Sequence, residues 1–188
     1  MLPLFLVQRW QSVLTIRTED DETYLLRFAD TRVLPALSGQ AAIWKRLAAD
    51  LTAWAIIGRD ASVVSLEMPT APDHDDALPR LGNDGLSALL QAGTADAMAE
   101  YLGEYFPDLL APRAGAENHR LLARVAELCA KHDIPGSTEQ HALAAATLLS
   151  DGRLPVQPDL GEWLDKKSHW QGRMEDALME FMEKRGIA

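Results

Sequence analysis

The stretch RFADTRVL, residues 27–34, marks the point where the spacing of apolar residues changes. Before it, residues 23–28 alternate between apolar and polar in the manner of a half-buried strand. After it, apolar residues of the segment 33–37 recur at helical spacing, and Asp30 can cap that helix at its N-terminus. The stretch therefore predicts a strand that leads directly into a helix, which is the arrangement of a mixed α and β protein.

The charged residues of this stretch allow two interpretations. Arg27, Asp30 and Arg32 could form a substrate clamp or part of a catalytic site. Alternatively, Asp30 caps the helix and pairs with an arginine, which fixes the helix against the sheet. The stretch contains no nucleophile, histidine or phosphate-binding glycine, so the sequence favours the structural joint.

The residues around the stretch predict a small antiparallel sheet lobe at 1–66 with inserted helices. Alternating apolar residues indicate strands, consecutive acids indicate an exposed loop, and apolar residues at helical spacing indicate a helix. These rules predict strands at 12–18, 23–28, 54–58 and 61–67, an acidic loop at 19–22, and a helix at 40–51. The helices must cover one face of the sheet, because a half-buried sheet needs an apolar partner layer.

The second part of the chain is predicted to be helical. Residues 67–84 contain three prolines and several acids without periodicity, so they are expected to form an acidic linker. Residues 85–188 show helical spacing that is interrupted near Gly93, Pro107, Pro135 and Gly152. Capping boxes are expected at Ser137 with Gln140 and at Ser168 with Gln171. The fold class is therefore α+β, with an all-helical C-terminal lobe at 85–188.

Composition and charge exclude some classes of function. The net charge is −10, and residues 1–66 are balanced, so the whole acidic excess lies in residues 67–188. No basic stripe is present to track phosphates, which argues against nucleic-acid binding. No apolar run reaches the length of a membrane helix, and the N-terminus lacks the features of a secretory leader. With a single cysteine, Cys129, no intrachain disulfide can form, and we expect a cytoplasmic protein.

Candidate chemical sites in the sequence favour structural interpretations. The run DHDD at 73–76 could bind a hard cation, but it lies in the proline-rich linker without a fixed frame. Cys129 and His132 have C-x-x-H spacing, but no second pair of zinc ligands exists, so Cys129 is expected in the core and His132 at a helix end. No nucleophile elbow, phosphate loop or metal motif occurs. We therefore expect no enzymatic activity, no metal and no cofactor.

The five tryptophans are expected to be mainly core residues. Trp163 is the one expected to be least buried, because its helix is short and flanked by polar loops. It is therefore a candidate for partner contact.

The order of these features resembles the type VI secretion adaptor family, the effector chaperones encoded beside VgrG spike proteins. The resemblance lies first in a strand ending in Arg-Phe and an Asp-x-Arg-Val-Leu helix start; the matching residues are Arg27, Phe28, Asp30, Arg32, Val33 and Leu34. It continues in the C-terminal segments HDIPGSTEQ, LLSDGRLPV and EWLDKKSHWQGRMEDAL, so that it covers about residues 10–182. Family members often carry a proline where this chain has Thr31, and usually an additional strand and helix before the hairpin, part of which is expected to be missing here.

This resemblance implies a non-enzymatic role. Such adaptors bind a toxic effector in the cytoplasm of the donor bacterium and assist its loading onto the VgrG spike. An immunity or regulatory protein that binds and neutralises a toxin is the alternative, since it would also be small, acidic and without catalytic motifs. Both interpretations predict a protein partner, no nucleic acid and no membrane, and neither identifies the cargo, the docking surface or the oligomeric state.

Overall fold

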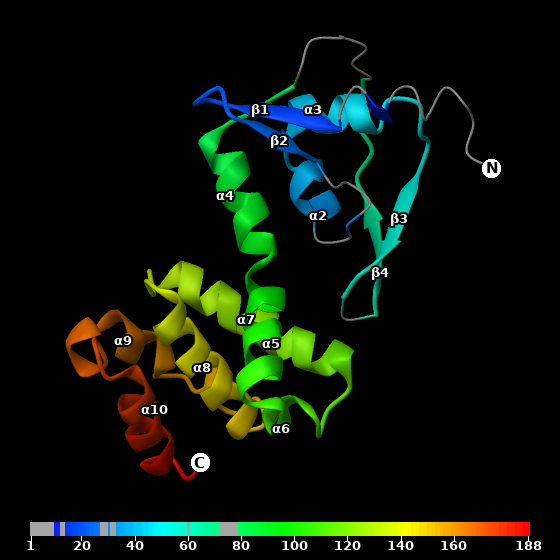
Figure 1. Ribbon diagram of the computed structural model, residues 1–188. Coiled ribbons are helices and arrows are strands. Elements are labelled where there is room, and N and C mark those ends of the chain that lie inside the picture. The colour runs from blue at the N-terminus through cyan, green and yellow to red at the C-terminus, as the bar shows by residue number, and fades with distance from the viewer. Residues whose placement is uncertain (1–9, 12–13, 27–29, 31–32, 60, 72–78) are drawn as a thin grey trace. The chain divides into compact units, whose positions relative to one another are not determined.

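The computed structural model describes residues 10–11, 14–26, 30, 33–59, 61–71 and 79–188. The fold is α+β, as the sequence predicted, with a helical C-terminal region (Figure 1). The chain divides into two compact units, Met1–Gly93 and Thr94–Ala188. Each unit has its own hydrophobic core and is described separately.

The first unit combines two small sheets with short helices. Its elements are β1 (Thr15–Thr18), β2 (Thr23–Leu25), α2 (Val33–Ser38), α3 (Ala41–Leu47), β3 (Trp54–Ile57), β4 (Val63–Leu66), β5 (Arg80–Leu81) and α4 (Asn83–Ala92). One sheet has the strand order β2-β1-β5, and β3 and β4 form the other. Both predicted hairpins are confirmed, with β1 antiparallel to β2 and β3 antiparallel to β4.

The core of the first unit is built around the tryptophan of α3. The ring centroid of Trp44 lies 5.6 Å from that of Trp54, which lies 5.6 Å from that of Trp10 on its other side. The Trp44 indole also donates a 2.7 Å hydrogen bond to the carbonyl of Glu67. Leu37 of α2 and Ile43 of α3 are fully buried beside this stack, which confirms the apolar spacing assigned to both helices.

The boundary between the units differs from the predicted one. The expected linker 67–84 contains β5, whose Arg80 and Leu81 pair in parallel with Arg17 and Thr18 of β1. The helix α4 also belongs to the first unit, where it packs against α2. The division therefore falls after Gly93, because Leu81 is buried in the first core and anchors the chain that follows it.

The second unit is wholly helical. Its elements are α5 (Thr94–Tyr105), α6 (Pro107–Leu110), α7 (Gly115–Lys131), α8 (Ser137–Leu149), the 3-10 turn η1 (Leu154–Val156), α9 (Leu160–Asp165), the 3-10 turn η2 (Lys167–His169) and α10 (Met174–Glu183). The longest helix, α7, packs against both α5 and α8. Leu122, Val125 and Cys129 on its inner face are buried, as their spacing predicted.

The capping boxes predicted for the last two long helices are wrong. The N-cap of α8 is Gly136, and the amide of Gln140 instead donates to the carbonyl of Ile134 at 3.1 Å. The N-cap of α10 is Arg173, and neither cap makes a side-chain hydrogen bond to its helix. Gly136, whose φ is 75°, occupies the N-cap position, so Ser137 is the first residue of the helix and not its cap.

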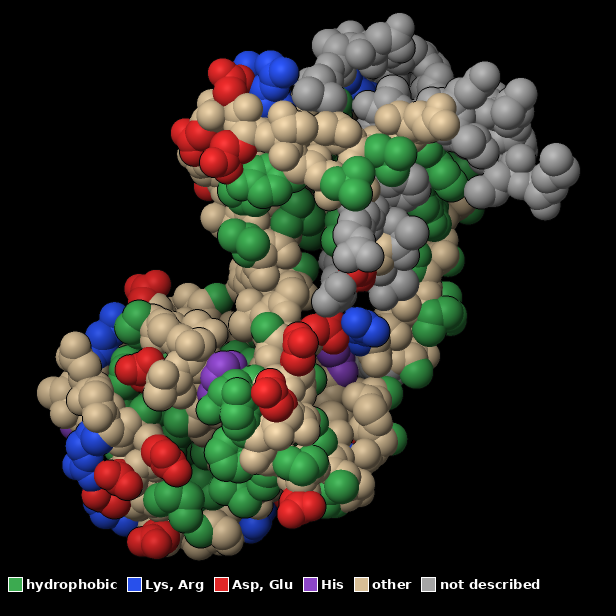
Figure 2. Space-filling model, viewed as in Figure 1, with side chains coloured by type: hydrophobic (Ala, Val, Ile, Leu, Met, Phe, Trp, Pro, Cys, Tyr) green, Lys and Arg blue, Asp and Glu red, His purple; other side chains and the backbone are tan. Residues whose placement is uncertain are grey.

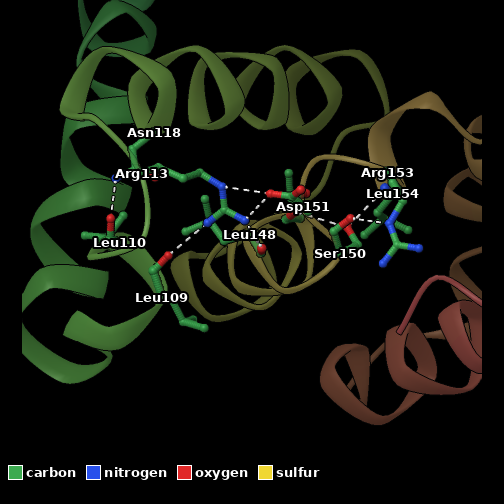
Figure 3. A network of polar contacts seen from close by, with 10 residues as sticks. Leu109, Leu110, Arg113, Asn118, Leu148, Ser150, Asp151, Arg153 and Leu154 are labelled. Atoms are coloured by element: carbon green, nitrogen blue, oxygen red, sulfur yellow. Dashed lines mark hydrogen bonds and ion pairs between the residues drawn. The ribbon is translucent and has the colours of Figure 1, made fainter.

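A buried polar network joins the loop before α7 to the end of α8 (Figure 3). The guanidinium of Arg113 donates to the carbonyl of Leu109 at 3.2 Å and to that of Leu148 at 2.8 Å, and it pairs with Asp151 at 2.6 Å. The Arg113 side chain is only 11% exposed. This arginine therefore satisfies helix-terminal carbonyls that would otherwise be buried without donors.

Candidate functional site

The predicted corner residues are only partly within the described chain. Asp30 lies at the N-terminal end of α2, where its carbonyl accepts the backbone N–H groups of Val33 at 3.0 Å and Leu34 at 3.3 Å. Arg27, Phe28 and Arg32 lie outside the described residues. The position of Asp30 at the start of the helix is confirmed, whereas its ion pair with an arginine stays a prediction.

The β3–β4 hairpin presents apolar side chains to solvent. Ile57 is 60% exposed and Val63 is 70% exposed, and the two residues are directly opposite each other in the antiparallel register. Ala55 and Ser65, the next pair on the same face, are also exposed. The other face packs against the first core through Leu66, so the hairpin has one buried and one solvent-facing side.

The hairpin also presents main-chain groups at its edges. Among the described residues, no third strand pairs with β3 or β4. Gly58 donates its N–H to the carbonyl of Ser62 at 2.8 Å, which makes this a hydrogen-bonded pair. Because such pairs alternate along an antiparallel ladder, the neighbouring pair Ile57 and Val63 directs its N–H and C=O groups away from the partner strand. The same residues thus offer apolar side chains and main-chain donors and acceptors that no other strand of the described chain uses.

This hairpin lacks the usual protection of an edge strand. Neither β3 (Trp54–Ile57) nor β4 (Val63–Leu66) contains a charged residue or a proline. Natural proteins usually shield exposed edges with such residues, since an open apolar edge pairs with other chains. The hairpin surface, defined here as Ala55, Ile57, Val63 and Ser65 with the outer edges of β3 and β4, is therefore suited to bind an extended polypeptide.

A pocket in the second unit lies beside Trp163. It has a volume of about 430 Å³ and is bounded by α9, η2 and α10. Trp163 and Phe181 form its aromatic floor, with ring centroids 5.1 Å apart and planes inclined at 54°. Trp163 is partly buried and packs against the second core, so it is more exposed than Trp44 and Trp170. Trp10 and Trp54 are also partly buried. That Trp163 is the least buried of the five tryptophans therefore stays a prediction.

The rim of this pocket is rich in cations, although the chain as a whole is strongly acidic. Arg173, Lys184 and Arg185 line it, whereas Glu180 is the one carboxylate in the lining. Arg173 pairs with Glu180, and Arg185 forms a forked pair with Asp159. The hydrogen bond from Arg185 lowers the pKa of the Asp159 carboxyl. In the described part of the chain, Lys184 makes no ion pair, so it carries the unbalanced positive charge of the rim.

Charged side chains elsewhere on the second unit are mixed in sign. Figure 2 shows acidic and basic side chains interspersed with exposed apolar ones on the face in view, without an extended basic area. The pocket beside Trp163 is thus a local concentration of positive charge. Apart from Trp163, no residue of this pocket was predicted from the sequence, because the lining comes from three separate elements.

The structure pairs a histidine with a carboxylate that sequence spacing did not connect. Nδ1 of His132 lies 2.6 Å from Oδ1 of Asp165, and the residues are 33 positions apart. Nε2 of His132 is buried without a hydrogen-bond partner among the described residues, and Gly161 lies against the imidazole. The pair therefore bridges the C-terminal end of α7 and α9.

Cys129 and His132 lie where the sequence predicted them. Cys129 is buried in the second core, and burial raises the pKa of its thiol to about 12. His132 is the C-cap residue of α7. The described residues contain no group of three metal-ligating side chains, and 73–76 lie outside them.

Comparisons with known proteins found no matching family model, no similar curated protein and no similar solved structure. Among the described helices, none is long and apolar enough to cross a membrane.

Proposed function

We propose that this protein is a non-enzymatic adaptor that binds a type VI secretion effector and assists its loading onto the VgrG spike. The observation that carries the binding role is the hairpin surface, where Ile57 and Val63 combine exposed apolar side chains with main-chain groups directed away from the partner strand. The resemblance of the stretch at 27–34 and of the C-terminal segments to adaptor sequences supports a secretion effector as the class of partner. The site of action would be the cytoplasm of the donor cell.

An extended segment of the effector is the partner that the hairpin surface fits best. Adding a strand to β3 or β4 would satisfy the outward N–H and C=O groups, and it would cover the Ile57–Val63 pair. Main-chain hydrogen bonds contribute affinity in this mode, while the side chains of alternate residues contribute specificity. Such a mode suits a chaperone, because a terminal segment of the cargo can be extended before it folds.

The test mixes the full chain with the protein encoded by the adjacent effector gene and measures complex formation by size-exclusion chromatography and calorimetry. Val63→Lys and Ile57→Lys are expected to weaken binding at least tenfold, because a lysine on this face prevents burial of the pair. Leu90→Lys is the matched control, since Leu90 on α4 is also 70% exposed. Circular dichroism verifies that all three variants stay folded.

Three results would separate the alternatives. Binding that is lost in the hairpin variants and kept in Leu90→Lys supports the adaptor. Absence of any complex between the wild-type chain and the effector contradicts it. A complex that abolishes the toxic activity of the effector and protects cells expressing it would instead favour the immunity protein.

A further inference from the structure

We propose that the pocket beside Trp163 binds a carboxylate attached to an apolar group. This inference does not depend on the adaptor function, because the pocket lies wholly within the second unit and the hairpin surface lies in the first. It assigns a ligand class to a cavity that the proposed protein-binding role leaves without a use.

The floor of the pocket supplies an apolar contact surface. Trp163 of α9 supplies most of this surface, because Ala177 and Phe181 of α10 also line the pocket but are only 4% and 3% exposed. Trp163 is only partly buried, so part of its indole remains accessible to a ligand. Pockets for small ligands commonly combine such an aromatic surface with a few polar groups, and about 430 Å³ lies within their usual range of roughly 300–1,000 Å³.

The two arginines of the rim are already engaged. Arg185 holds Asp159 through both Nε and Nη2, donates to the carbonyl of Phe181 at 3.0 Å, and lies 3.5 Å from the centroid of the Phe181 ring. Arg173 holds Glu180. Both guanidinium groups therefore already bind carboxylates of the protein itself. Their paired N–H donors, which could otherwise bind a phosphate, are occupied.

The donors that remain are few and suit a single negative charge. Lys184 has no ion-pair partner, and the Ser168 hydroxyl and the His169 imidazole make no side-chain hydrogen bond within the described residues. One ammonium group and two polar neighbours match a monovalent carboxylate better than a phosphate, which needs more donors. The ligand thus places its apolar part on Trp163 and its carboxylate beside Lys184.

Two sources present this chemistry, namely the C-terminal residue of a polypeptide and a free aryl-alkyl carboxylate. The experiment titrates the ¹⁵N-labelled full chain with acetyl-Gly-Phe, with acetyl-Gly-Phe amide, and with 3-phenylpropionate. The readout is the indole N–H signal of Trp163, which Trp163→Phe identifies by its loss. We expect saturable shifts with a Kd on the order of 1 mM for acetyl-Gly-Phe and a much weaker effect of the amide.

Lys184→Gln is expected to weaken binding of acetyl-Gly-Phe about fivefold, which corresponds to the loss of one partly screened ion pair. Lys131→Gln, on the exposed surface at the end of α7, is the charge-matched control and should leave the Kd unchanged. Equal binding of acid and amide, no shift of the Trp163 signal with any probe, or equal losses in both lysine variants would overturn the proposal. If acetyl-Gly-Phe binds and 3-phenylpropionate does not, the ligand is the C-terminal residue of a polypeptide. If both bind, the ligand class includes free aryl-alkyl carboxylates.

Discussion

The imidazole of His132 and the carboxylate of Asp165 are joined by a 2.6 Å hydrogen bond, although the histidine side chain is 5% exposed and the aspartate side chain is 66% exposed. A solvent-accessible carboxylate thus serves as the acceptor for a buried ring nitrogen. The pair connects the C-terminus of α7 to α9, and it places Gly161 against the ring, where an added Cβ would lie 3.4 Å from Cε1.

Loss of this acceptor should destabilise the second unit. In Asp165→Ala, Nδ1 of His132 loses its charged acceptor, so the free energy of unfolding is expected to fall by about 1–2 kcal/mol. Urea denaturation followed by circular dichroism measures the change. Glu127→Ala, which removes an exposed acid of α7, serves as the control. Equal stability of Asp165→Ala and the wild type would show that the bridge contributes nothing.

Replacement of Arg113 should have a comparable effect for a different reason. Arg113→Ala removes the donors to the carbonyls of Leu109 and Leu148 and the pairing with Asp151, so we expect a loss of about 1–3 kcal/mol. Arg113→Lys should restore only part of it, since an ammonium cannot reproduce the planar fork. Arg124→Ala, at an exposed position of α7, is the comparison. Full rescue by lysine would contradict the role assigned to the guanidinium geometry.

Two glycines with nearly the same positive φ should differ in their tolerance of alanine. Gly152 and Gly172 have φ of 73° and 75°, so alanine at either position incurs the left-handed penalty of about 1 kcal/mol. At Gly152 the new Cβ would also lie 2.7 Å from Cδ2 of Leu121, whereas nothing lies within 4 Å at Gly172. Thermal denaturation should therefore give a lower Tm for Gly152→Ala than for Gly172→Ala. The reverse order would rule out the Leu121 contact as the cause.

Cys129 should be chemically inert in the folded protein. Burial raises the pKa of its thiol to about 12, so almost no thiolate exists near neutral pH, and the core also blocks access. Iodoacetamide at about pH 8 should leave the native chain unmodified and should alkylate it fully in urea, as measured by mass spectrometry. Rapid alkylation under native conditions would show that the second core opens on the timescale of labelling.

Stability should decrease on mild acidification through His141. Its ring stacks on Tyr101 with centroids 3.7 Å apart and planes at 7°, and burial lowers the pKa of His141 below its ordinary value of 6.5. As the pH falls below 6.5, the unfolded chain binds this proton more readily than the folded chain, so the free energy of unfolding decreases. His141→Phe should reduce the loss of stability between about pH 7.5 and about pH 5. An NMR titration that places the pKa of His141 above the ordinary value would contradict this prediction.

Several elements could be predicted from the sequence because their information is local. The acidic loop between β1 and β2 indicated a hairpin, and the spacing of Leu122, Val125 and Cys129 indicated the buried face of α7. A strand repeats every two residues and a helix about every 3.6, so one short window contains the whole pattern. By contrast, the capping box at Ser137 failed because Gly136, with a positive φ, occupies the N-cap position of α8, and a short sequence motif does not record that backbone conformation.

The amino-acid sequence by itself determined the α+β class, the hairpin of β1 with β2 and that of β3 with β4, and the burial of Cys129. Only the tertiary structure decided that β5 joins the sheet of β1, that His132 meets Asp165, and that Trp163, Phe181 and Lys184 surround one pocket. The physical reason is that periodic burial is specified within each element, whereas these contacts join residues far apart in the chain. Such contacts depend on how the folded helices and strands pack against one another, and this packing leaves no repeating pattern in the sequence.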